Sequence, residues 1–190
     1  LYESSSRADR EELYRWIEYY KIKFKSRVYT PLNNSEKYTL VLMGRADFGL
    51  LGSYNKYKQT PFETFHVGGD GMTGSYTYAT ETIGLRGYDN GALTPYSDGR
   101  AYTRFSMELH FPFLLQPSST IYGLAFVEGG NAWTSLENFN PFSLKRSAGV
   151  GVRIFLPMIG LMGIDWAYGF DKVQGEKGGG HFHFILGQEF

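Results

Sequence analysis

The chain has 190 residues, with 19 acidic and 19 basic side chains and no cysteine, so its formal net charge is zero. A neutral chain without a clustered Lys/Arg tract gives no electrostatic basis for nucleic-acid binding. The absence of cysteine excludes a disulfide framework, a thiolate metal site and a cysteine nucleophile. Aromatic residues make up 17% and glycine accounts for 24 positions, although the mean hydropathy is only -0.31. No run of about 18 apolar residues is present, so no transmembrane helix is expected.

Alternation of apolar and polar residues, which is typical of half-buried strands, dominates the chain. The first alternating segment begins at Trp16, and its polar row is basic, with three lysines and an arginine. A Gly/Tyr/Thr-rich stretch over 70–100 contains at most one short strand, SYTYAT, and a helix is expected only around residues 6–14. Strands are predicted over 16–28, 38–50, 61–69, 101–113, 119–133, 144–156, 160–171 and 181–190.

The lengths of these strands and of their connections favour a membrane barrel. About eight strands have roughly ten residues or more, the length that a tilted strand needs to cross a bilayer. Tight, proline-bearing turns at 112–118 and 157–160 contrast with long polar connections, as in outer-membrane barrels. The turn at 31–36 fits less well, because it is short on the side expected to carry long loops. The long connections cover 70–100, 134–143 and 172–180.

A soluble β-sandwich or a lipocalin-like barrel also alternates apolar and polar residues, but its apolar face is a core in which small aliphatic residues dominate. Here large aromatic residues lie near the strand ends, as in the interfacial girdle of a membrane barrel. We expect Trp16, Trp133 and Trp166 at the membrane interface. Opposite charges on the polar rows suit a wet lumen. The predicted fold class is therefore all-β, a transmembrane antiparallel β-barrel.

Motifs from residue 85 onward carry a family resemblance. In their order and spacing they resemble the outer-membrane assembly and translocation barrels, the superfamily of bacterial BamA, mitochondrial Sam and chloroplast Toc proteins. The resemblance is firm over about 60–190 and rests on strand pattern alone over 1–60. The motifs are LRGYDNG (85–91), FVEGGNAW (126–133), SAGVGVRIFLP (147–157), IDWAYGFD (164–171) and the ending FHFILGQEF (182–190).

The resemblance implies a 16-stranded barrel preceded by POTRA domains, of which this chain supplies about the last eight strands. It also implies that the extracellular loop at about 69–100 folds into the lumen. A closed eight-stranded barrel has room inside for side chains and little else. The chain also starts without a methionine or a signal segment. We therefore expect residues 1–190 to be the C-terminal half of a larger barrel.

The resemblance further implies a docked loop motif whose arginine meets two acidic residues on the inner wall. The matching carboxylates are Glu108 and Glu128. Glu108 lies on the polar row of its predicted strand, which supports its assignment. The row of Glu128 also holds apolar residues, so the assignment of Glu128 rests on the motif. Without the resemblance, the arginine would be an ordinary exposed loop residue. The loop motif comprises Leu85, Arg86, Gly87 and Tyr88.

The alternating residues at the chain's end are predicted to serve as the recognition signal of the barrel and as one side of a seam between first and last strands. The apolar row would face lipid, and Gly187 would face inward. The residues of this signal are Phe182, Phe184, Leu186, Gly187 and Phe190.

Other polar residues have simpler explanations than chemistry. His181 and His183 lie on one face and could present imidazoles to a metal, but lumen polarity explains them as well. Asp165 is expected to be a lumen-facing wall residue, and the Gly pairs at 68–69 and 129–130 permit bends or close backbone approach. No catalytic set, cofactor or metal site is expected, and we do not expect an enzyme.

The functional expectation is the central subunit of the machinery that folds and inserts outer-membrane proteins through a lateral seam. Its partners would be unfolded outer-membrane clients, accessory lipoproteins and membrane lipid, and its location the bacterial outer membrane. A polypeptide-exporting translocase of the same superfamily is the alternative. A small closed barrel serving as an adhesin or anchor is a third, weaker one.

Overall fold

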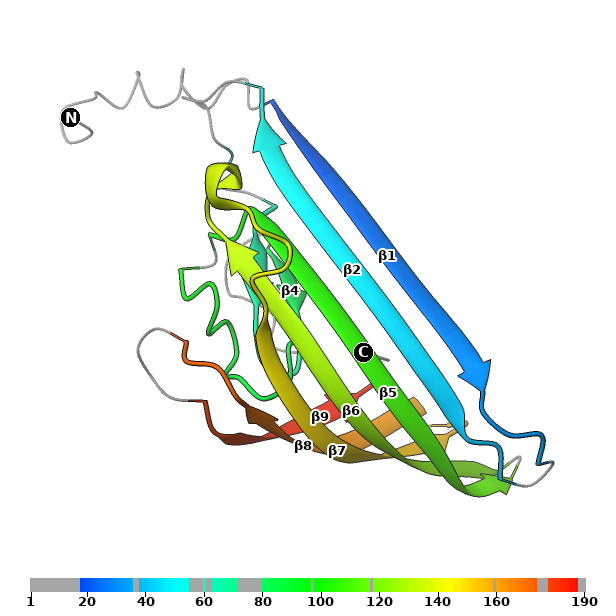
Figure 1. Ribbon diagram of the computed structural model, residues 1–190. Coiled ribbons are helices and arrows are strands. Elements are labelled where there is room, and N and C mark those ends of the chain that lie inside the picture. Colours follow the sequence, from blue (N-terminus) through cyan, green and yellow to red (C-terminus); the bar gives the residue numbers. More distant parts are fainter. Residues whose placement is uncertain are drawn as a thin grey trace.

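The computed structural model describes residues 18–35, 38–54, 60, 63–71, 80–96, 98–116, 118–158, 160–173 and 178–187. One antiparallel sheet forms a long, curved wall (Figure 1). Its strand order is β1-β2-β5-β6-β7-β8-β9, and within the described residues β1 and β9 are its unpaired edges, so the barrel is not closed. The strands are β1 (Tyr19–Pro31), β2 (Val41–Ser53), β5 (Ala101–Gln116), β6 (Ser119–Trp133), β7 (Lys145–Leu156), β8 (Gly160–Gly169) and β9 (Gly180–Leu186).

Two short strands form a second sheet on the concave side of this wall (Figure 1). They are β3 (Phe65–Val67) and β4 (Glu81–Ile83), which pair in parallel. A single turn of 3-10 helix, η1 (Leu136–Asn138), lies in the β6–β7 connection. In the parts of the chain that the structure describes, no helix has the length and apolar character needed to cross a membrane.

The predicted fold class is confirmed, and the strands of the wall agree with the predicted segments to within a few residues at their ends. Residues 61–69 differ, because only Phe65–Val67 forms a strand and it pairs with β4 rather than with the wall. Positive φ angles at Gly68 (134°) and Gly69 (74°) turn the chain away immediately afterwards. The predicted helix at 6–14, Trp16 and most of SYTYAT lie outside the described residues.

Because residues 61–69 do not form a strand of the wall, the short turn at 31–36 lies on the side of the barrel that carries short turns. With seven strands in the wall, the β1–β2 connection lies at the same end as the tight β5–β6 and β7–β8 turns (Figure 1). The long connections all lie at the other end. The short turn therefore agrees with the barrel pattern, and the sequence-based misfit came from counting one strand too many.

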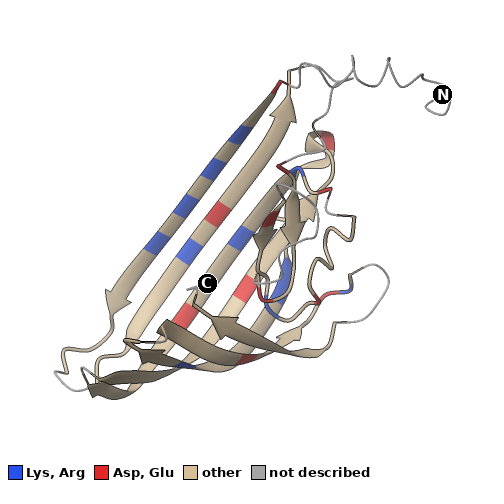
Figure 2. Ribbon diagram, turned by 180° about the vertical axis from the view of Figure 1, so that it is seen from behind, with Lys and Arg blue, Asp and Glu red and all other residues tan. Residues whose placement is uncertain are grey.

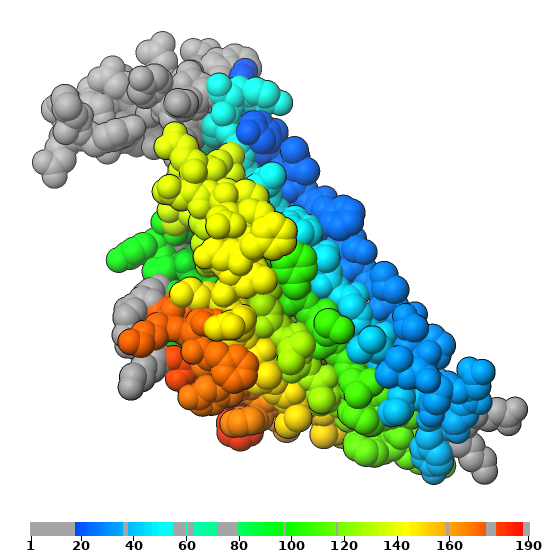
Figure 3. All heavy atoms as spheres, viewed as in Figure 1, coloured from blue at the N-terminus to red at the C-terminus, as the bar shows by residue number. Residues whose placement is uncertain are grey.

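The outer face of the wall is apolar. Its side chains alternate with inner ones along every strand and form diagonal rows over the outside of the molecule (Figure 3). Large apolar side chains there are exposed, among them Phe24, Met107, Val127 and Val150. An exposed apolar band of this kind suits contact with lipid.

The inner face is polar and charged, which Figure 2 shows as bands along the strands. Along β1 four successive inner residues are basic: Lys21, Lys23, Lys25 and Arg27. They lie beside inner residues of β2, where Asp47 and Arg45 form an ion pair of 2.6 Å. The polar rows of β1 and β2 therefore face the lumen.

The loop between β2 and β5 is held against the inner face by its own apolar core. Phe65 and Val67 of β3 and Ile83 of β4 pack on Leu51 and Tyr102 of the wall. The rings of Phe65 and Tyr102 meet edge to face, with centroids 4.7 Å apart. Burial of each large apolar side chain contributes about 1.5–3 kcal/mol. This core fixes the start of the loop and so positions the segment that follows β4.

Candidate functional site: a loop tip docked on the inner wall

The LRGY segment follows β4 and is aligned by backbone hydrogen bonds before its side chains meet the wall. Leu85 exchanges two of these bonds with Gly69, with N···O distances of 3.0 and 3.1 Å. Its side chain is buried beside Gly130, where an added Cβ would lie 3.1 Å from Leu85 Cδ1. The glycine of β6 thus leaves room for the loop, as expected for the Gly pair.

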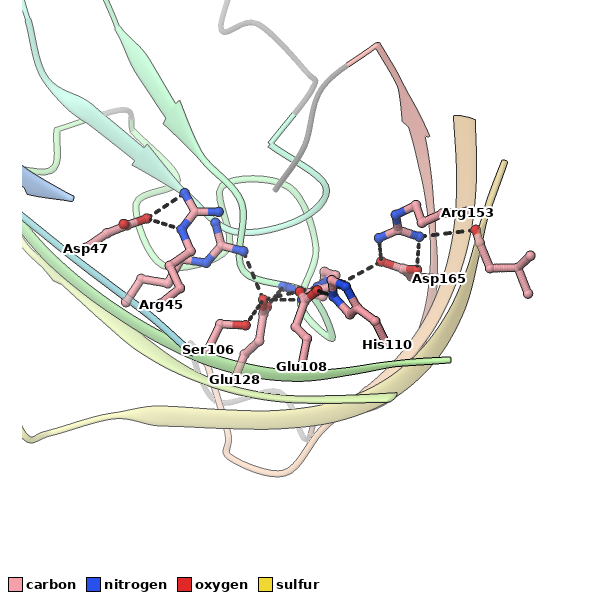
Figure 4. A network of polar contacts seen from close by, with 11 residues as sticks. Arg45, Asp47, Ser106, Glu108, His110, Glu128, Arg153 and Asp165 are labelled. Carbon is pink, nitrogen blue, oxygen red and sulfur yellow. Dashed lines mark hydrogen bonds and ion pairs between the residues drawn. The ribbon is translucent and has the colours of Figure 1, made fainter. Parts of the chain in front are cut away.

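Arg86 is completely buried and binds three carboxylates from three strands of the wall. Its Nε donates to Glu128 Oε1 at 3.1 Å, and its backbone N–H donates to Glu128 Oε2 at 2.9 Å. Its Nη2 donates to Glu108 and its Nη1 to Asp165 Oδ2 at 2.9 Å. Figure 4 shows Glu108, Glu128 and Asp165 pointing from the wall into the concave side.

The aromatic ring of Phe126 packs against the guanidinium of Arg86. The Arg86 Cζ lies 3.5 Å from the ring centroid of Phe126, within the range of a cation–π interaction. Phe126 and Leu124 share the inner row of β6 with Glu128 and are buried. The apolar residues that made the parity of Glu128 ambiguous therefore face inward with it, and Arg86 of the loop covers Phe126.

Each carboxylate has a second cationic or polar partner. Arg104 donates to Glu128 at 2.9 Å, His110 lies 2.9 Å from Glu108, and Arg153 donates to Asp165 at 2.7 Å. Three arginines, Arg86, Arg104 and Arg153, are thus balanced by three acidic side chains. A buried network of this kind is tolerable only when its charges are paired and hydrogen-bonded.

Gly87 and Tyr88 continue the contact towards the last strands. Gly87 has φ of 88°, and an added Cβ would lie 2.7 Å from Ser147 Cβ. Its N–H donates to His183 Nε2 on β9 at 3.0 Å. The Tyr88 hydroxyl donates to the Arg146 carbonyl at 2.6 Å, and burial raises the pKa of Tyr88 to about 12. The phenol therefore remains a donor at all physiological pH values.

The structure brings together all four motif residues with Glu108 and Glu128. It adds Asp165, which the sequence placed on the lumen wall without a partner, and Arg104, Arg153 and His183, which the sequence did not single out for this site. Asp165 and Arg153 both lie within the quoted motifs, and inner-row parity was the signal that could have found them. Neither motif by itself shows which residues of other segments Asp165 and Arg153 will contact.

The remaining predicted residues lie elsewhere. Phe182, Phe184 and Leu186 point outward from β9 and are 69%, 63% and 64% exposed. Gly187 follows the strand with φ of 72° and donates its N–H to the Leu161 carbonyl. Phe190 and Trp16 lie outside the described residues.

The two other predicted interface aromatics both lie on the wall. Trp166 is on the outer face of β8 and is 42% exposed. Trp133 ends β6 and packs edge to face on Phe139, with centroids 4.9 Å apart. Trp166 is therefore exposed on the outer face, and Trp133 is partly buried at the end of its strand.

Comparison with known proteins identifies the family. The model of the Omp85 superfamily domain matches residues 8–190. Among solved structures, the crystal structure of BamA from Haemophilus ducreyi lacking POTRA domains 1–3 is similar, with a TM-score of 0.64 and 21% identity. The match covers 88% of this chain and 35% of that one, so this chain spans about a third of its relative's length. That likeness establishes the fold, and the family match shows that the chain belongs to the Omp85 superfamily.

Proposed function

We propose that this chain is the C-terminal part of an outer-membrane barrel that folds and inserts other β-barrel proteins into the bacterial outer membrane. Membership of the Omp85 superfamily supports the class of function. The observation that carries the proposal is the edge of the wall at β9. Within the described residues this strand pairs only with β8, and its outer row is apolar.

An edge strand of this kind can template another strand. Where the pairing of β9 with the strand that closes the full barrel opens, the N–H and C=O groups of β9 can bind a client strand by β-augmentation. Among the described residues β9 has 7 residues, whereas β8 has 10 and β5 has 16. Burial of the client's apolar surface and satisfaction of its backbone groups in lipid supply the free energy. No cofactor or bond chemistry is needed.

The docked loop tip supports this role by bracing the wall. It joins residues of β5, β6, β8 and β9 from the concave side. These contacts would keep the wall curved while β9 exchanges one pairing strand for another. Unfolded outer-membrane proteins are the proposed clients, and accessory lipoproteins and outer-membrane lipid the proposed partners.

The test uses the full-length protein reconstituted in lipid vesicles with a urea-denatured outer-membrane barrel as client. Insertion is measured as the fraction of client that becomes heat-modifiable and protease-resistant. We expect Arg86→Ala to reduce insertion strongly and Arg86→Lys to restore it only in part, because an ammonium cannot bind three carboxylates in the fork geometry of a guanidinium. Lys172→Ala, at an exposed position in the connection between β8 and β9, is the matched control. Wild-type insertion by Arg86→Ala would refute a role for the docked tip.

A translocase that exports a polypeptide through the lumen is the second candidate. Four successive basic residues on the inner row of β1, from Lys21 to Arg27, favour it, because they line the concave side of the wall. The same vesicles distinguish the two functions. An insertase leaves the client embedded in the bilayer, whereas a translocase delivers a passenger to the far side, where an external protease cannot reach it.

A further inference from the structure

We propose that His183 is a positioning residue that couples the docked loop tip to the edge strand β9. Its functional consequence rests on the proposed insertase activity, whereas the coupling itself is a property of the fold. Through this residue, the position of the last strand would depend on whether the loop is docked.

The contact lies where it can control β9. His183 is the middle residue of the strand, and it is 5% exposed. Its Nε2 accepts the Gly87 N–H at 3.0 Å. His183 is also the register partner of Asp165 on β8, which binds the Arg86 guanidinium. Two consecutive loop residues thus hold two paired residues of the last two strands.

Close packing leaves the loop tip little freedom to compensate for loss of this bond. An added Cβ on Gly169 of β8 would lie 2.3 Å from the Gly87 carbonyl oxygen, so the backbones touch. Gly87 N–H is enclosed here, and a buried amide without an acceptor carries the full cost of its desolvation. Movement of β9 away from β8 would leave this amide unpaired. Displacement of the edge strand therefore has to break the contact or carry the loop with it.

The acceptor role also defines the chemical state of the histidine. A backbone N–H can donate only to an unprotonated ring nitrogen, so the proton of neutral His183 is on Nδ1. The charged and titratable groups around the ring are Asp70, Asp165, Arg86 and His181. Protonation of Nε2 would remove the acceptor and release the loop from β9. The tautomer is thus a spectroscopic signature of the coupling.

The experiment measures hydrogen exchange in the full-length protein in lipid vesicles. His183→Leu removes the acceptor, whereas His183→Gln places a carboxamide oxygen near the position of Nε2. Phe184→Leu is the control, since Phe184 lies next to His183 in β9 but points outward and is 63% exposed. We expect His183→Leu to speed exchange on the order of tenfold both at Gly87 and along β9. His183→Gln should retain most of the protection, and Phe184→Leu should leave it unchanged.

Unaltered exchange at Gly87 in His183→Leu, or equal loss in the Gln and Leu variants, would overturn the proposal. ¹⁵N NMR of histidine-labelled wild-type protein tests it without any substitution, because a protonated Nε2 on His183 contradicts the bond. These readouts do not depend on insertion. Failure of the wild-type protein to insert a client would instead count against the proposed function and leave the coupling standing.

Discussion

At the scale of single residues, Asp165 has the most demanding position in the wall. Its side chain is fully buried, and its two oxygens accept from Arg86 and Arg153. Removal of its charge leaves two buried guanidiniums with too few carboxylates. Breaking a buried ion pair in this way typically costs about 3–5 kcal/mol, because the surviving charge is stranded away from water.

We therefore expect Asp165→Asn to destabilise the full-length barrel by about 3–5 kcal/mol. The measurement is the free energy of unfolding in detergent, from urea titrations followed by heat-modifiability. Asp171→Asn is the control, because Asp171 pairs with an Arg146 side chain that is 69% exposed. Exposed pairs contribute little. Equal midpoints for the wild-type protein and Asp165→Asn would show that the network does not stabilise the barrel.

At the scale of elements, the loop tip depends on one left-handed backbone position. Gly87→Ala forces an L-residue to φ of 88° and places its Cβ against Ser147 and the Gly169 amide. The conformation alone costs about 1–2 kcal/mol. The clash should add to that cost and undock the tip, which is measured as faster hydrogen exchange over residues 85–88.

Gly160 provides the matched control for this substitution. It has φ of 95° at the start of β8, but an added Cβ there meets nothing within 4 Å. Gly160→Ala should therefore show the backbone strain without undocking. If both variants exchanged alike over residues 85–88, the close approach of Gly87 to the wall would not matter for docking.

The inner sheet is tied to the wall through one carboxylate on β4. Glu81 lies 3.1 Å from Lys21 Nζ and 3.0 Å from Lys23 Nζ. Burial opposes ionisation of Glu81, but the hydrogen bonds from Lys23 and Lys21 outweigh it, so the pKa of this carboxyl is lowered from 4.5. Its stabilising contribution is therefore present above its ordinary pKa and is lost as pH falls through the lowered value.

We expect Glu81→Gln to destabilise the barrel near neutral pH and to match the wild-type protein once Glu81 is protonated, at a pH below 4.5. The measurement is the unfolding midpoint of both proteins as pH is lowered. Glu137→Gln, on the exposed turn η1, should track the wild-type protein throughout. A difference between the wild-type protein and Glu81→Gln that persisted at low pH would contradict the ion-pair account.

At the scale of the whole molecule, the wall is an open sheet with two free edges. In a bilayer, unpaired edge groups have no water to bind, so stable spanning sheets are closed. The described strands leave β1 and β9 unpaired with each other. We therefore expect the strands that close the sheet to lie outside the described residues.

Residues 1–190 alone are accordingly expected not to refold in detergent as a heat-modifiable monomer, whereas the full-length protein should do so. The measurement is the gel mobility of unheated and heated samples after refolding. A compact, heat-modifiable monomer formed by the 190-residue chain would instead support a small closed barrel that serves as an anchor or adhesin.

Much of the architecture could be predicted from the sequence, because a strand repeats every two residues and that period is visible in one chain. Alternation located the seven wall strands and separated lipid-facing residues such as Phe182 from lumen-facing ones such as His183. The resemblance to the family supplied Arg86, Glu108 and Glu128. The sequence failed at 61–69, where a short apolar run resembled a wall strand but packs inside the lumen.

What only the tertiary structure decided is which distant residues meet. Asp165 and His183 follow Arg86 and Gly87 by about 80 to 100 positions along the chain, and no local pattern records that they are partners. Phe126, an apolar residue on the inner row of β6 beside Glu128, is covered by Arg86 of the folded-back loop. Alternation determines which face of the wall a side chain occupies. Curvature of the whole sheet decides what that face touches, since only a rolled wall brings five strands within reach of one loop tip.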